Sequence, residues 1–181
     1  RSHPLSRERV SSLQDLVDNS PYKDKTDTPR EIADYALMRA KLRGFIEKPE
    51  TVLRRYPQSD KSQAGRYARA VAFFRAADME RALPEVDSLI AERPDYAYFW
   101  ELKGQMLVES SRPKEGVPAY RKAVELAPNE PLIQASFGAA LLAMEDAAVI
   151  PEAMKHLKMA IKDEPENGMA SARLVAPVHS T

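Results

Sequence analysis

Cysteine is absent from the 181 residues, so the chain has neither disulfides nor thiolate metal ligands. Charge of one sign is not in excess either. Lysine and arginine total 27, aspartate and glutamate also total 27, and no global field attracts nucleic acid or an anionic membrane. No apolar run approaches the roughly 18 residues that a membrane-spanning helix needs. We therefore expect neither nucleic-acid binding nor membrane insertion.

Glycine is scarce, with six residues against fourteen prolines, and runs of β-branched residues are few. Alanine, leucine, glutamate, arginine and lysine are abundant, and these are good helix formers. Hydrophobic residues make up 44% of the chain, which is enough to bury a sizeable core. The composition predicts an all-α protein whose helices are punctuated by proline.

An internal repeat is marked by prolines that follow amphipathic runs, at Pro94, Pro128 and Pro165, in steps of 34 and 37 residues. Small residues recur in the same steps, in the columns Ala70, Gly104 and Gly138; Ala82, Gly116 and Ala153; and Leu89, Ala123 and Ala160. The three extra residues fall between Gly138 and Ala153. Each unit divides into two helical patterns joined by a short turn, which predicts a helix-turn-helix array.

Small residues are expected where two antiparallel helices cross, because only small side chains allow a close approach. Gly104 in a first helix and Gly116 and Ala123 in a second helix fit that requirement. A Gly104→Leu change would overpack the crossing and cost on the order of 1 to 3 kcal/mol or more.

With its period of 34, Trp100 and Gly104 opening a unit, Gly116 and Ala123 inside it, and Pro128 closing it, the chain resembles the tetratricopeptide repeat family. The resemblance implies a helix-turn-helix solenoid that forms a right-handed superhelix. The middle unit matches best, and in the first unit Arg66 replaces the usual aromatic residue. The three repeats are expected at 63–96, 97–130 and 131–167.

Flanking segments extend the array at both ends. Residues 29–62 are expected to form a degenerate helix pair, with Thr28 as its cap, a break near Gly44 and an end at Pro57. A linker over 21–28 precedes this pair. Residues 168–181 are expected to begin a truncated helix or to form a disordered tail.

Catalytic and metal motifs are not evident in the repeats, and we expect no catalytic residue, metal site or cofactor in them. Glu152 and His156 lie four residues apart, but two ligands do not make a metal site, and an exposed hydrogen-bonded pair is expected there. The stretch from Arg39 to Arg55 carries six basic residues against Glu47 and Glu50, which favours a solvated face over a phosphate-binding one.

Stacked helix pairs offer a concave groove lined by their first helices. Counted from the first residue of each expected repeat, positions 5, 9 and 12 share one face of the first helix. We expect some of the apolar side chains at these positions to pack between helices. Lysine and asparagine, which clamp a terminal carboxylate in some such repeats, do not occupy these positions. The expected ligand is therefore an extended or partly unfolded polypeptide with apolar side chains. The residues predicted to bind it are Tyr67, Tyr98, Glu101, Gln105 and Glu109.

The opening stretch over 1–20 predicts a helix capped by Ser6, with Val10, Leu13, Leu16 and Val17 recurring on one face. It also carries a second resemblance. His3-Pro4 followed by Ser6, Glu8, Arg9, Val10 and Leu13 resembles the segment that closes the catalytic domain of M48-type (Ste24-like) zinc metallopeptidases.

That resemblance implies a bacterial parent protein in which an upstream catalytic domain binds zinc, and in which His3 faces the active site. It also implies a periplasmic protease and chaperone for envelope proteins, with the repeats presenting substrate or docking on the assembly machinery. Two alternatives remain open. One is a free-standing tetratricopeptide scaffold, cytoplasmic or periplasmic, without an enzyme attached. The other is a nucleic-acid-binding helical repeat that uses the Arg39 to Arg55 surplus.

Overall fold

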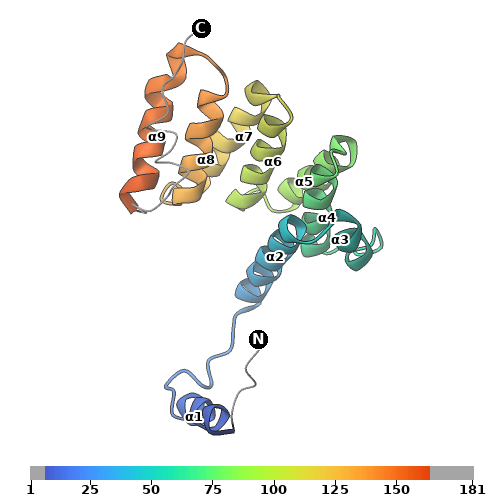
Figure 1. The fold of residues 1–181 in the computed structure, drawn as a ribbon, viewed down its shortest axis with the longest axis vertical. Coiled ribbons are helices and arrows are strands. Elements are labelled where there is room, and N and C mark those ends of the chain that lie inside the picture. The colour runs from blue at the N-terminus through green and yellow to red at the C-terminus, as the bar shows by residue number, and fades with distance from the viewer. Residues whose placement is uncertain (1–6, 164–181) are drawn as a thin grey trace. The chain divides into compact units, whose positions relative to one another are not determined.

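The computed structural model describes residues 7–163, and every regular element in that range is helical. This confirms the all-α fold class (Figure 1). His3, the Ser6 cap and the expected element over 168–181 lie outside the described residues. The elements are α1 Arg7–Asp18, α2 Pro29–Ile46, α3 Pro49–Arg55, α4 Gln63–Arg75, α5 Met79–Glu92, α6 Ala97–Glu109, α7 Pro113–Leu126, α8 Pro131–Leu142, the 3-10 helix η1 Ala147–Val149 and α9 Ile150–Asp163.

The chain divides into two compact units, Arg1–Ala36 and Leu37–Thr181. Helix α1 of the first unit ends at Asp18, and the Asn19 backbone N–H donates to the Asp15 carbonyl. Its expected apolar face is exposed, because four large side chains are 51 to 69% accessible. They are Val10, Leu13, Leu16 and Val17.

Helix α2 begins with the capping residue that the sequence predicts. The Glu31 backbone N–H donates to Thr28 Oγ1 at 3.2 Å, and the Thr28 backbone N–H donates back to the Glu31 carboxylate at 2.7 Å. This reciprocal arrangement satisfies two backbone donors that a helix start otherwise leaves unpaired.

The expected break near Gly44 is wrong, because α2 continues through it to Ile46. Gly44 is buried where an added Cβ would lie 2.7 Å from Val71 Cβ of α4, so its role is a close helix approach rather than a helix end. The chain breaks instead before Pro49, the first residue of α3, where proline is favoured.

The repeat period is visible in the backbone of the second unit. Ala77, Ser111 and Glu145 each have a positive φ of 54 to 61° and stand 34 residues apart, at the turn between the two helices of each pair. Because Glu145 is still in step, the three-residue insertion follows it, where η1 lies. Helices α4, α6 and α8 pack against α5, α7 and α9 respectively, and α6 also contacts α8 directly.

Helix crossings within the pairs occur at the small residues that the sequence indicates. A Cβ added to Gly104 would lie 2.6 Å from the Tyr120 ring, and one added to Gly116 would lie 2.9 Å from the Gly104 carbonyl oxygen. Ala123 is fully buried, and α7 ends at Leu126, before Pro128. The glycines therefore set the distance between α6 and α7.

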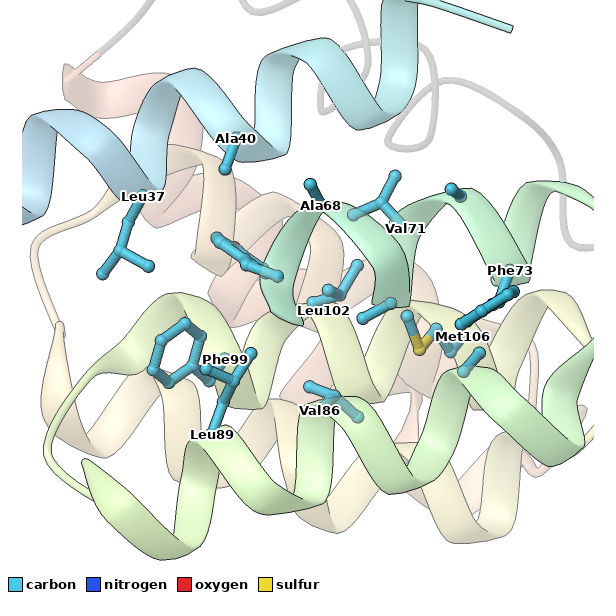
Figure 2. Close-up of a cluster of buried hydrophobic side chains, with 14 of the residues drawn as sticks. Leu37, Ala40, Ala68, Val71, Phe73, Val86, Leu89, Phe99, Leu102 and Met106 are labelled. Carbon is cyan, nitrogen blue, oxygen red and sulfur yellow. The ribbon is translucent and has the colours of Figure 1, made fainter. Parts of the chain in front are cut away.

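Apolar side chains from α2, α4, α5 and α6 form one continuous core (Figure 2). The labelled members are Leu37, Ala40, Ala68, Val71, Phe73, Val86, Leu89, Phe99, Leu102 and Met106. Arg69 is 2% exposed beside this core. Its guanidinium donates to the Pro57 and Asp60 carbonyls, both at 2.8 Å, and to Glu85 at 2.6 Å, which ties the loop before α4 to the repeat.

A repeated hydrogen bond also joins α6 and α8, the first helices of the second and third pairs, to the loops before them. Trp100 Nε1 donates to the Pro94 carbonyl at 2.9 Å, and Gln134 Nε2, 34 residues later, donates to the Pro128 carbonyl at 2.6 Å. These bonds occupy carbonyls of the loops that separate repeats, and thereby fix how one pair follows the next.

Candidate functional site

A hollow of about 550 Å³ lies among the first helices of the second unit. A neighbouring hollow of about 790 Å³ shares Phe45, Gln105 and Glu109 with it, so the two form one continuous groove. We call the two together the groove. The first hollow is lined by Lys41, Phe45, Glu101, Gln105, Val108, Glu109, Tyr120, Leu132, Ser136, Ala139, Ala140, Leu142 and Ala143.

Helix α8 shows which face of a first helix lines the groove. Leu132, Ser136, Ala139 and Ala143 are spaced by four, three and four residues, and all four side chains line the first hollow. Ala135 is fully buried and faces away from it. Positions 9 and 12 of the predicted face, Ala139 and Leu142, therefore line the hollow in α8, whereas Ala135 at position 5 does not.

Tyr67 is consequently misplaced in the sequence prediction. It is 1% exposed, its ring packs edge-on against Phe99 with centroids 5.1 Å apart, and its hydroxyl donates to the Tyr98 carbonyl at 3.2 Å. Tyr67 is a core residue that links α4 to α6. Its predicted place on the groove surface is wrong, because its side chain is buried between α4 and α6.

Glu101, Gln105 and Glu109 do line the groove. Gln105 Nε2 donates to Glu109 Oε1 at 2.8 Å, so the amide holds the exposed carboxylate in place. Tyr98 is half-buried on the same helix as these three residues. The groove thus brings three of the five predicted residues together, with Tyr98 beside them.

Lys41 is the groove residue that sequence reasoning missed. Its Nζ donates to Glu101 Oε2 at 2.6 Å and lies 5.4 Å from the centre of the Tyr98 ring. The Glu101 side chain is only 6% exposed, so the ion pair compensates a desolvated carboxylate. Sixty residues separate the two partners, and no local spacing in the sequence links them.

Two tyrosines at the groove have raised pKa values, mainly because they are buried. Burial raises the pKa of Tyr98 to about 12, and the carboxylates of Glu130 and Glu101 add to this. Burial also raises the pKa of Tyr120, with further contributions from Glu101 and Glu109. Both phenols are therefore neutral hydrogen-bonding groups near carboxylates.

Apolar side chains form the walls. Phe45, Val108 and Leu142 are half-buried, and Leu132 is 46% exposed. Val108 and Leu142 also pack against a buried cluster around Phe137, so part of each side chain stabilises the fold and part faces the groove. Phe74, from α4, lines the neighbouring hollow.

The expected exposed pair of Glu152 and His156 is wrong. Glu152 pairs with Arg121 of α7 at 2.5 Å, while His156 is 8% exposed and its Nδ1 lies 2.5 Å from Gln134 Oε1. Because the Gln134 amide nitrogen donates to the Pro128 carbonyl, its oxygen accepts and His156 Nδ1 carries the proton. Burial lowers the pKa of His156. Within residues 7–163 no group of three potential ligands could hold a metal ion.

The basic stretch from Arg39 to Arg55 is largely engaged in contacts of the fold. Besides the Lys41 pair, Arg55 lies 3.5 Å from the Glu47 carboxylate, and Arg43 lies 3.9 Å from it. Arg54 donates to Thr51 at 3.3 Å. Over the described part of the chain, no helix is long and apolar enough to cross a membrane.

Similarity to solved structures shows the fold. Two structures of the MamA protein match with TM-scores of 0.57 and 0.52, the second being MamA of AMB-1. The first covers 95% of this chain and 87% of its own at 16% identity, and the second covers 94% and 90% at 18% identity. The fold is a tetratricopeptide-type helical repeat. No protein-family model matches the chain.

A curated relative matches part of the chain. The peroxisomal targeting signal receptor of Eremothecium gossypii is 28% identical over 102 residues, or 56% of this chain. The match spans only 17% of the relative's own length.

Proposed function

We propose that this domain binds an extended or partly unfolded polypeptide segment in the groove. The observation that carries the proposal is the groove itself, a hollow with apolar walls and a few convergent polar groups on its floor. Its apolar walls suit apolar side chains, and Gln105, Ser136 and the two tyrosines suit the polar backbone of a peptide.

The rigid walls also favour this use. Each helix that lines the groove packs closely against a neighbouring helix through a buried glycine, so a ligand needs to order little of the groove when it binds. The relative from Eremothecium gossypii is described as a receptor for a targeting signal, which supports a polypeptide as the ligand.

The test compares two substitutions of the same kind. Ala139→Trp fills the groove wall, whereas Ala148→Trp adds the same side chain in η1, outside the groove. We expect a fluorescent dodecapeptide with four leucines and no charged side chain to bind the unaltered chain and the Ala148 variant equally, and the Ala139 variant about tenfold or more weakly. Equal binding by both variants would place the ligand elsewhere, and no binding by the unaltered chain would refute the proposal.

We further propose that these repeats belong to a periplasmic M48-type zinc metallopeptidase that acts in envelope protein quality control. The support is the resemblance over His3-Pro4 to Leu13, and zinc would be bound by the catalytic domain upstream rather than by the repeats. His3 would face that active site. The test is the coding sequence upstream of Arg1. An HExxH motif with a later glutamate ligand and a signal peptide supports the proposal, and an unrelated upstream domain or a nearby start codon refutes it.

A further inference from the structure

We infer that the groove selects a basic polypeptide segment, with a lysine or arginine held at Glu109 and leucine-like side chains against the walls. This rests on the proposed polypeptide binding and adds the charge of the ligand to it. The groove carries four charged side chains, and the way each is compensated decides the sign of the ligand. They are Lys41, Arg75, Glu101 and Glu109.

In the first hollow two of the three charges neutralise each other, and the fourth charge of the groove, Arg75, lines only the neighbouring hollow. Lys41 and Glu101 neutralise each other at 2.6 Å. Arg75 Nη1 donates to the Gly44 and Glu47 carbonyls at 3.0 and 2.5 Å, at the carboxyl end of α2, where the helix dipole favours a cation. The Glu109 carboxylate, by contrast, receives the Gln105 amide, which holds it in place without adding charge.

Lys41 shows that this surface accepts an ammonium group. Its Nζ sits against a carboxylate and over the Tyr98 ring, which together form a desolvated cation site. Glu109 lies on the same helix two turns after Glu101, and both carboxylates line the same hollow with the neutral Tyr120. A basic side chain of a ligand would find at Glu109 an exposed carboxylate beside the apolar walls, whereas Lys41 pairs with a Glu101 carboxylate that is buried.

The apolar contacts of the ligand follow from the same geometry. Val108 adjoins Glu109 on α6, while Leu132 and Leu142 line the hollow from α8. A segment that places a basic residue at Glu109 would therefore have leucine-like neighbours against these walls. An acidic residue at the same place would meet like charge, which disfavours acidic segments.

The experiment uses the full chain and two fluorescent dodecapeptides with the same four leucines, one with two arginines and the other with two glutamates. We expect the arginine peptide to bind about tenfold more tightly. We expect that preference to shrink as sodium chloride rises from about 50 to about 500 mM. Equal affinity of the two peptides would overturn the inference while leaving polypeptide binding intact. Binding of neither peptide, together with no binding of the uncharged dodecapeptide, would refute the groove as a polypeptide site.

Two glutamine variants localise the effect. Glu109→Gln should weaken the arginine peptide about threefold and leave the glutamate peptide unchanged or slightly tighter. Glu125→Gln on α7 is the matched control, since Glu125 is an exposed carboxylate paired with Lys122 outside the groove. Equal losses in both variants would mean that general surface charge, rather than Glu109, attracts the peptide.

Discussion

Gly104 provides a quantitative test of the helix crossing that forms the groove floor. In Gly104→Ala the new Cβ would lie 2.6 Å from Tyr120 Cδ2 and 2.8 Å from Cγ, whereas carbon atoms pack best at about 3.5 to 4.0 Å. The ring would have to retreat by about 1 Å. Tyr120 is only 5% exposed and is packed with Phe137, so it has little room to move.

The expected loss combines two opposing effects. Overpacking costs up to about 3 kcal/mol, and alanine is better than glycine inside a helix by about 1 kcal/mol. We expect a net loss of about 2 kcal/mol in the free energy of unfolding, or about 4 to 8 °C in Tm. Chemical denaturation followed by far-ultraviolet circular dichroism measures it.

Gly65→Ala is the matched control. Its new Cβ would meet the Asp60 carboxylate, the end of a flexible side chain, so we expect a change of less than about 1 kcal/mol. If Gly104→Ala proved as stable as the unaltered chain or more stable, Tyr120 would not be fixed against α6. The account of the crossing would then be wrong.

Three further changes test other parts of the fold by the same denaturation assay. Ser111→Gly should stabilise by about 1 kcal/mol, because only glycine adopts its φ of 61° without strain, and a loss would contradict that backbone geometry. Arg69→Met should destabilise by about 3 to 5 kcal/mol by leaving Glu85 and two loop carbonyls unpaired, and a change below about 1 kcal/mol would contradict it. Because burial lowers the pKa of His156, the unfolded state binds the proton more readily, so stability should fall as the pH drops below the ordinary histidine value of about 6.5. His156→Gln should flatten this slope, and an unchanged slope would exclude His156 as its source.

The repeat could be predicted because it depends on how small residues are spaced along the sequence. A period of 34 with small residues at fixed places located Gly104, Gly116 and Ala123 at helix crossings, and the structure has them there. The spacing placed the three-residue insertion between Gly138 and Ala153. Because Glu145 is still in step with the repeat, the insertion follows it, in the part that contains η1.

The site was less predictable because it depends on how helices are rotated and on partners far apart in sequence. Tyr67 and Glu101 occupy the same repeat position, yet one is a core ring and the other a buried carboxylate neutralised from α2. Gly44 looked like a helix breaker, but because it has no Cβ it allows α4 to pack closely against α2. In each case the deciding neighbour comes from another helix, and helical periodicity alone does not give it.

Hydrogen exchange of the full chain with and without the uncharged leucine dodecapeptide tests the central claim most directly. The account predicts that added protection gathers on the segments of α6 and α8 that line the groove, around Gln105 and Ala139, while exchange in α5 and α7 is unchanged. Protection confined to α5 and α7, or none at a saturating peptide concentration, would contradict the claim that the groove is the polypeptide-binding site.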